Sequence, residues 1–234
     1  MVIQRERWRE MRQMAQTTAG QREPLFGEGI VSPHKIIATP EGPIFLQAAC
    51  SPSLVACLRA DSGLRAFARL PEREHALLLG LAQRSDCSLT LAYTTTGEII
   101  GQVTLAPADA WWKGLASAYE IAVEVSSGWR RHGIARQLLT LVFERESLEH
   151  LIILGLGLSW HWDTEGLGIS RFRYRALVEQ LFAPYGFVEY MTSEGNISMD
   201  PANILLARLG RGVDQETISH FFQLLLQSDT LPGL

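Results

Sequence analysis

The sequence has few cysteines and no long hydrophobic segment. Its three cysteines are an odd number, and none stands in a CxxC or CxxH spacing, so neither a disulfide framework nor a metal site is indicated. The longest apolar run, residues 151–158, contains two glycines and is far shorter than the about 20 residues that cross a bilayer. Residues 1–20 lack the apolar core of a secretory signal. These absences predict a cytoplasmic protein with no membrane partner.

The chain also lacks the excess of basic residues that nucleic-acid-binding proteins carry. Its formal net charge is −4, which argues against a nucleic-acid partner but leaves room for a local basic site. With 234 residues, 47% of them hydrophobic, the chain is long enough for one domain with a full core. We predict an N-terminal extension over 1–28, a domain over 29–210, and a C-terminal helix over 211–234 that packs on the domain.

Hydrophobic periodicity and turn residues predict alternating strands and helices. Strands are predicted at 35–38, 44–49, 88–93, 99–105, 119–125, 151–158, 187–191 and 204–208. Helices are predicted at 51–58, from Pro71, from Ile134, from a Ser170 cap with Tyr174, Leu177, Val178 and Leu181 inward, and from an Asp214 cap with Ile218, Phe221, Phe222 and Leu225 inward. The order indicates an α+β fold. Segments 119–125 and 151–158 are expected to pair in parallel, because such a crossover normally runs through a helix.

The most informative segment runs from a strand through a polar turn into a helix. The turn has the pattern Arg130-x-x-Gly133-x-Ala135, and Arg131, His132 and Arg136 add positive charge. A helix N-terminus attracts phosphate through its unpaired N–H groups and its dipole, and small residues let the ligand approach the backbone. Neither a G-x-G-x-x-G fingerprint nor a Gly-Lys-Ser/Thr loop is present. The alternative is a solvated basic helix start on a structural α/β unit.

This turn resembles the R/Q-x-x-G-x-G/A motif that follows the fourth strand in the GNAT superfamily of N-acetyltransferases. Trp160-His-Trp-Asp163, Asp200-Pro-Ala-Asn203 and Gln215-Glu-Thr-Ile218 further resemble the acetoin-utilisation acetyltransferases, a bacterial family within it. The resemblance covers roughly residues 85–225. That family often has a proline and a glycine where this chain has Ser127 and Arg131.

The resemblance implies a GNAT fold: a mixed central sheet, flanked by helices, that splays open between the fourth and fifth strands. It implies acetyl-CoA as cosubstrate, with pyrophosphate on the turn amides, pantetheine along residues 123–125 and an oxyanion donor at the Val123 amide. The coenzyme-binding residues it implies are Val123, Val125, Arg130, Arg131, His132, Gly133, Ile134, Ala135 and Arg136. It also implies a partner, because enzymes of this family acetylate a lysine of acetyl-CoA synthetase.

A base, reached directly or through water, would assist direct acetyl transfer to an amine, since only about 0.1% of a lysine side chain is neutral near pH 7.4. Glu120 and Glu124 face the same side of the strand before the turn, and by superfamily geometry Glu124 is nearer the thioester. His161 and Asp163 follow the next strand, where GNAT proteins admit the acceptor, and could relay a proton or hold the acceptor lysine. Alternatively, the carboxylates face solvent or pair with arginines, and the His-x-Asp pair is structural.

The sequence thus predicts an N-acetyltransferase that acetylates a protein lysine, on acetyl-CoA synthetase, by direct transfer within a ternary complex. A GNAT enzyme acting on a small amine is the first alternative, which acidic residues near the site would favour. A non-catalytic acyl-CoA-binding regulator is the second, in which Glu124 and His161 would be dispensable.

Overall fold

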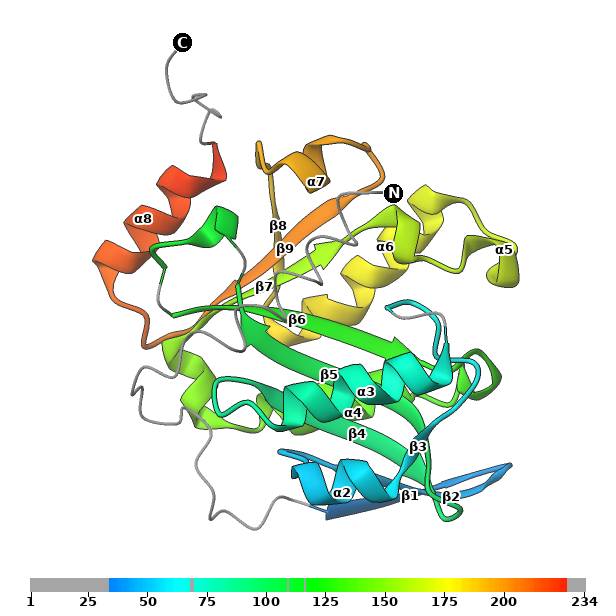
Figure 1. The fold of residues 1–234 in the computed structure, drawn as a ribbon. Helices are drawn as coiled ribbons and strands as arrows, with labels where there is room; N and C mark the ends of the chain where they lie inside the picture. The colour runs from blue at the N-terminus through cyan, green and yellow to red at the C-terminus, as the bar shows by residue number, and fades with distance from the viewer. Residues whose placement is uncertain (1–33, 68–69, 109, 116, 227–234) are drawn as a thin grey trace.

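The computed structural model describes residues 34–67, 70–108, 110–115 and 117–226. The predicted extension over 1–28 therefore lies outside the described residues. Within them, one sheet holds the strands in the order β1-β2-β4-β5-β6-β7-β9-β8, and the short β3 pairs with β5 (Figure 1).

The predicted strands and helices are confirmed, and each differs from its prediction by a few residues at its ends. The strands are β1 His34–Thr39, β2 Gly42–Gln47, β3 Arg59–Ala60, β4 Ser88–Thr94, β5 Glu98–Pro107, β6 Ala118–Val125, β7 Ile152–Gly157, β8 Val188–Tyr190 and β9 Ile204–Leu209. The α-helices are α2 Pro52–Cys57, α3 Pro71–Ala82, α4 Ile134–Phe143, α5 Thr164–Leu167, α6 Arg171–Phe182, α7 Gly195–Ser198 and α8 Gln215–Leu225. The sequence did not predict β3, α5 or α7, because elements of two to four residues are too short to show a period.

Helix starts follow the sequence closely. The side chains of Ser170 and Asp214 cap α6 and α8 by accepting the backbone N–H of Arg173 and Thr217. Pro71 takes the first position of α3, where a missing N–H costs nothing. These local signals fix where the helices begin without help from the rest of the fold.

Helices cover both faces of the sheet. α4 and α6 pack on one face over a large apolar cluster that includes Ile121, Leu138 and Leu206. On the other face, α2 and α3 cover a cluster around Leu91, and α8 covers a separate cluster around Leu154 (Figure 1). Between these two clusters, the even-numbered residues of β6 carry side chains on that second face, including both candidate glutamates.

Two residues predicted to face inward do not. Leu177 of α6 and Phe222 of α8 are 46% and 48% exposed. Each is one residue away from a side chain that packs inward, Val178 and Phe221, and one residue corresponds to a 100° rotation around a helix. The predicted inward faces were therefore wider than the sheet surfaces that the helices cover.

The sheet opens between β6 and β7. These strands pair in parallel at Ala118 to Glu120 with Ile152 to Leu154, as predicted, and the pairing ends there. Beyond it, β6 continues along β5 as far as Val125, while β7 continues along β9 as far as Gly157. The expected splay, between the strand before the Arg130 turn and the next strand in the chain, is confirmed.

Two features are absent from the described residues. No helix within them is both long and apolar enough to cross a membrane. Nor do His, Cys, Asp and Glu side chains in that part of the chain gather in a group of three or more that could hold a metal ion.

Candidate active site

The turn after β6 presents the N-terminus of α4. Gly133 precedes α4 with φ 74°, a left-handed backbone that glycine adopts without strain. Arg131 is also left-handed, with φ 68°, which costs a non-glycine residue about 1–2 kcal/mol. A Cβ at Gly133 would meet nothing within 4 Å, so the turn backbone is open to a ligand.

The basic side chains of the turn point to different surroundings. Arg131 and Arg136 are exposed, and His132 Nε2 lies 3.4 Å from Glu41 Oε2. Arg130 Nη1 lies 2.5 Å from Asp163 Oδ2. The Arg130 hydrogen bond is the main factor that holds the pKa of Asp163 below its ordinary value. This ion pair joins the predicted coenzyme turn to the Trp-His-Trp-Asp segment.

Glu124 lies near the end of β6 with 8% of its surface exposed. Its Oε1 accepts the backbone N–H of Arg65 at 2.6 Å and of Ala66 at 2.8 Å, and its Oε2 accepts Gln102 Nε2 at 3.2 Å. Burial raises the pKa of Glu124, and these hydrogen bonds oppose the rise. The result is a carboxyl group that is fixed in position and holds a proton more tightly than an exposed glutamate does.

The loop over Glu124 is fastened to the end of β6. Asp61 Oδ1 accepts the Gly63 N–H at 2.9 Å and the Ser126 hydroxyl, and the Ser127 N–H donates to Gly63 O at 3.3 Å. A Cβ at Gly63 would overlap the hydroxyl oxygens of Ser126 and Ser127, so the close approach requires glycine. The loop therefore carries the Arg65 and Ala66 amides to Glu124 in a defined geometry.

His161 meets the same loop from the opposite side of the opening. Its Nδ1 lies 2.6 Å from the Ala66 carbonyl oxygen, and its ring centroid is 5.5 Å from that of Phe67. A carbonyl oxygen only accepts, so Nδ1 carries a proton in this contact. The Ala66 peptide thus bridges the two candidates, since its N–H binds Glu124 and its carbonyl binds His161.

The other two candidates lie elsewhere. Asp163 caps α5 by accepting the Gly166 N–H at 2.9 Å and holds Arg130, so its carboxylate is committed to local structure. Glu120 lies opposite Leu154 in the last residue pair before β6 and β7 part. It is half-buried and shares the face of Glu124, as its spacing predicted. Val123 and Val125 pack their side chains toward α4, beyond the point where pairing with β7 ends.

Sequence reasoning missed the groups that surround Glu124. Gln102 lies directly across from it on β5, and Gln102 Nε2 also donates to Glu74 Oε1 at 2.6 Å. Glu74, in the first turn of α3, is 1% exposed and points into this cluster. The available signals in the sequence were an Asp-x-Gly turn at Asp61 and a glutamine within an apolar strand. Neither signal identifies the residue that it contacts in the fold.

Comparison with known proteins places this geometry in a family. Residues 52–154 match the model of the acetyltransferase (GNAT) family. The chain is 31% identical over 193 residues to acetoin utilization protein AcuA of Bacillus subtilis, covering 80% of this chain and 91% of that protein. It is 30% identical over 196 residues to AcuA of Bacillus licheniformis, covering 81% and 92%.

A solved structure agrees in fold as well as in sequence. The acetoin utilization protein of Exiguobacterium sibiricum superposes with a TM-score of 0.76 at 30% identity, covering 83% of this chain and 93% of that one. Members of the GNAT family use acetyl-CoA as the acetyl donor. The chain therefore belongs to the GNAT family of N-acetyltransferases, within the group that contains the acetoin utilization proteins AcuA.

Proposed function

We propose that this enzyme transfers an acetyl group from acetyl-CoA directly to a lysine of a protein, and that the protein is acetyl-CoA synthetase. The observation that carries the proposal is Glu124, a buried carboxyl with a raised pKa held close to the opening between β6 and β7. The acceptor's identity rests on the similarity to AcuA proteins and not on the geometry.

The coenzyme side of the proposal uses backbone groups. The turn over residues 130–136 would hold the pyrophosphate by the first N–H groups of α4, with Arg131, His132 and Arg136 supplying positive charge. The amides of Val123 and Val125, past the last residue pair with β7, would hold the pantetheine. When bound, acetyl-CoA supplies an activated thioester, and the protein's task is to place an amine beside it.

Glu124 is the proposed general base. An acceptor ammonium must lose a proton before it can attack, and Glu124 would take that proton directly or through a water molecule. Burial moves the pKa of Glu124 toward neutral pH, which improves a carboxylate as a base, while the amides of Arg65 and Ala66 fix its orientation.

The remaining candidates take supporting roles in this proposal. His161 would line the acceptor side, where the Ala66 carbonyl holds its ring through Nδ1. Glu120 would attract the cationic acceptor from the same face of β6. Asp163 would keep the Trp-His-Trp-Asp segment and the coenzyme turn in register through Arg130.

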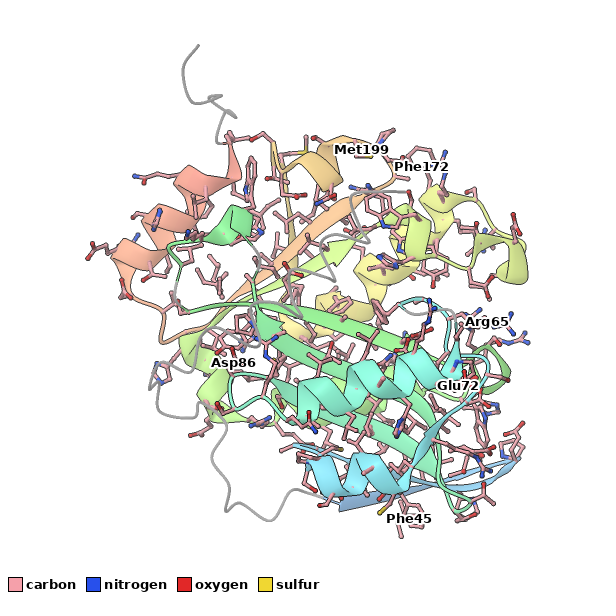
Figure 2. All side chains as sticks on the ribbon, in the orientation of Figure 1. Phe45, Arg65, Glu72, Asp86, Phe172 and Met199 are labelled. Atoms are coloured by element: carbon pink, nitrogen blue, oxygen red, sulfur yellow. The ribbon has the colours of Figure 1, made fainter. Side chains whose placement is uncertain are left out.

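The surface beside His161 supports a protein acceptor. Trp160, Phe172 and Met199 are 37%, 60% and 65% exposed. They are the sequence neighbours of Ser159, Arg171 and Asp200, respectively. These three polar residues are joined by hydrogen bonds, because Asp200 accepts from Ser159 and from Arg171. Phe172 and Met199 lie at the same end of the molecule (Figure 2). A small amine would have no use for this apolar rim, whereas a folded acceptor could cover it.

A small amine is the competing acceptor, and the paired face of Glu120 and Glu124 is the observation that favours it. Two carboxylates on one face would attract a compact cation as well as a lysine side chain. The two proposals differ in what the apolar rim contributes.

The test is mass spectrometry of purified acetyl-CoA synthetase after incubation with this enzyme and acetyl-CoA. We expect one acetyl-lysine, formed faster than without enzyme and lost with Glu124→Gln or His161→Ala. A parallel reaction offers polyamines and amino acids in place of the protein. Acetylation of those amines alone would favour the small-amine enzyme. No transfer to either acceptor, despite measurable acetyl-CoA binding, would favour a non-catalytic regulator.

A further inference from the structure

Asn203 belongs to the Asp200-Pro-Ala-Asn203 segment, which the catalytic proposal leaves without a role. It is 4% exposed and lies just before β9. Its Oδ1 accepts the backbone N–H of Ser159 at 2.7 Å, and its Nδ2 donates to the Asn196 carbonyl at 2.6 Å. A buried side-chain amide with both ends bonded to backbone fixes one segment relative to another.

Ser159 begins the short 3-10 helix that carries His161, Ser159–His161. Its N–H follows the end of β7 at Gly157 and is satisfied by Asn203. Asp200 holds the same residue from the side, because its Oδ2 accepts the Ser159 hydroxyl at 2.8 Å while its Oδ1 accepts the Ala202 N–H at 2.9 Å. The start of this helix is therefore held at two points by one segment.

The far end of this helix reaches the candidate base. His161 Nδ1 binds the Ala66 carbonyl, and the Ala66 N–H binds Glu124. A continuous path of contacts thus runs from Asn203 through the Ser159 helix and the Ala66 peptide to the carboxylate. A shift of about 1 Å in one reacting group can cost about 100-fold in rate. The position of Asn203, where this path of contacts starts, should therefore affect the rate of transfer.

We propose that Asn203, assisted by Asp200, is a positioning residue that sets the orientation and tautomer of His161. The inference rests on the proposed function, in which His161 lines the acceptor side. Neither Asn203 nor Asp200 touches the reacting groups in it. Asn203 acts through the Ser159 N–H, and Asp200 acts through the Ser159 hydroxyl.

The experiment measures His161 itself and, separately, transfer. Imidazole ¹⁵N NMR of the full chain, with His161 assigned by comparison with His161→Ala, reports which ring nitrogen is protonated. We expect His161 to be protonated at Nδ1 in the wild type. In Asn203→Ala the signal should move to a mixture of tautomers. The matched control is Asn196→Ala, which removes a side chain of the same type but keeps the backbone carbonyl that Asn203 binds.

Kinetics then separate positioning from general destabilisation. Asn203→Ala should lower kcat/KM for the protein acceptor about 10- to 100-fold while leaving the Kd for acetyl-CoA within about twofold. In a His161→Ala background the same substitution should have little further effect, because residues acting through one group are not additive. Ser159→Ala removes one of the two holding bonds and should give a smaller loss, which keeps the test available if Asn203→Ala does not fold.

The outcomes are distinct. An unchanged His161 signal in folded Asn203→Ala, or in folded Ser159→Ala if Asn203→Ala does not fold, would overturn the positioning role, as would full additivity with His161→Ala. The His161 signal could change in Asn203→Ala while the wild-type enzyme acetylates no protein lysine. That result would support the positioning role and refute the proposed acceptor.

Discussion

The coenzyme turn and the Glu124 site are built in opposite ways. The turn is one continuous segment, and its proposed recognition groups are the backbone N–H groups at the start of α4. The Glu124 site joins segments far apart in the chain, with contacts that span 59 residues to Arg65 and 22 to Gln102. Its loop also contacts His161 across 95 residues. Phosphate recognition needs only local backbone geometry, whereas a carboxyl group with a raised pKa needs burial, which only distant segments provide.

The largest effect is expected at Glu124. Glu124→Gln should lower kcat/KM about 10²- to 10⁴-fold while acetyl-CoA binding is kept, because the base is lost and the shape is preserved. In the wild type the base works when ionised, so kcat/KM should rise with pH through the raised pKa of Glu124. A pH–rate profile in both proteins checks this.

The free energy of unfolding should change with pH in the direction opposite to kcat/KM. Because the folded-state pKa of Glu124 is raised, burial of this group is least costly below the ordinary carboxyl pKa, and the folded state loses stability as pH rises through the folded pKa. Glu124→Gln should therefore remove this pH dependence of Tm. Glu120→Gln is the matched control and should lose less activity. Equal activity of Glu124→Gln and wild type would remove Glu124 from the mechanism.

The second effect is expected at the coenzyme turn. Gly133→Glu places a negative side chain in the open space before α4, and a like charge beside pyrophosphate costs several kcal/mol. The Kd for acetyl-CoA, measured by calorimetry, should rise about 100-fold or more. Gly80→Glu is the control, because a Cβ at Gly80 also meets nothing within 4 Å but Gly80 lies in α3. An unchanged Kd in folded Gly133→Glu would refute the assignment of the turn.

The smallest effect concerns the pair that joins the two regions. Arg130 and Asp163 are 24% and 39% exposed, so their coupling in a double-mutant cycle of Arg130→Ala and Asp163→Asn should be about 0.5–1 kcal/mol of unfolding free energy. The pKa of Asp163 is lowered, so this contribution is present above the ordinary carboxyl pKa and is lost as pH falls through the folded pKa.

The same double-mutant cycle also tests whether acetyl-CoA binding changes the coupling between Arg130 and Asp163. If Arg130 turns to the pyrophosphate when acetyl-CoA binds, the coupling should fall when the cycle is repeated with saturating acetyl-CoA. Additive effects of the two substitutions at neutral pH would show that the turn and the Trp-His-Trp-Asp segment are energetically separate.

Local signals predicted much of the fold. The caps Ser170 and Asp214 and the Pro71 start hold because they depend on residues within one helical turn. The inward faces were less well predicted, since Leu177 and Phe222 are apolar but lie beyond the width of the sheet surface that each helix covers. Burial depends on what a helix packs against, which its own period does not contain.

The sequence by itself determined the strand-turn-helix segment over 119–143, the glycine at its turn, and the shared face of Glu120 and Glu124. Each of these follows from spacing along one strand or one turn. Tertiary structure decided that Glu124 is buried under the Arg65 and Ala66 amides, that Gln102 lies opposite it, and that Asp163 binds Arg130. The physical reason is that desolvation and hydrogen-bond partners come from segments that meet only when the sheet has formed.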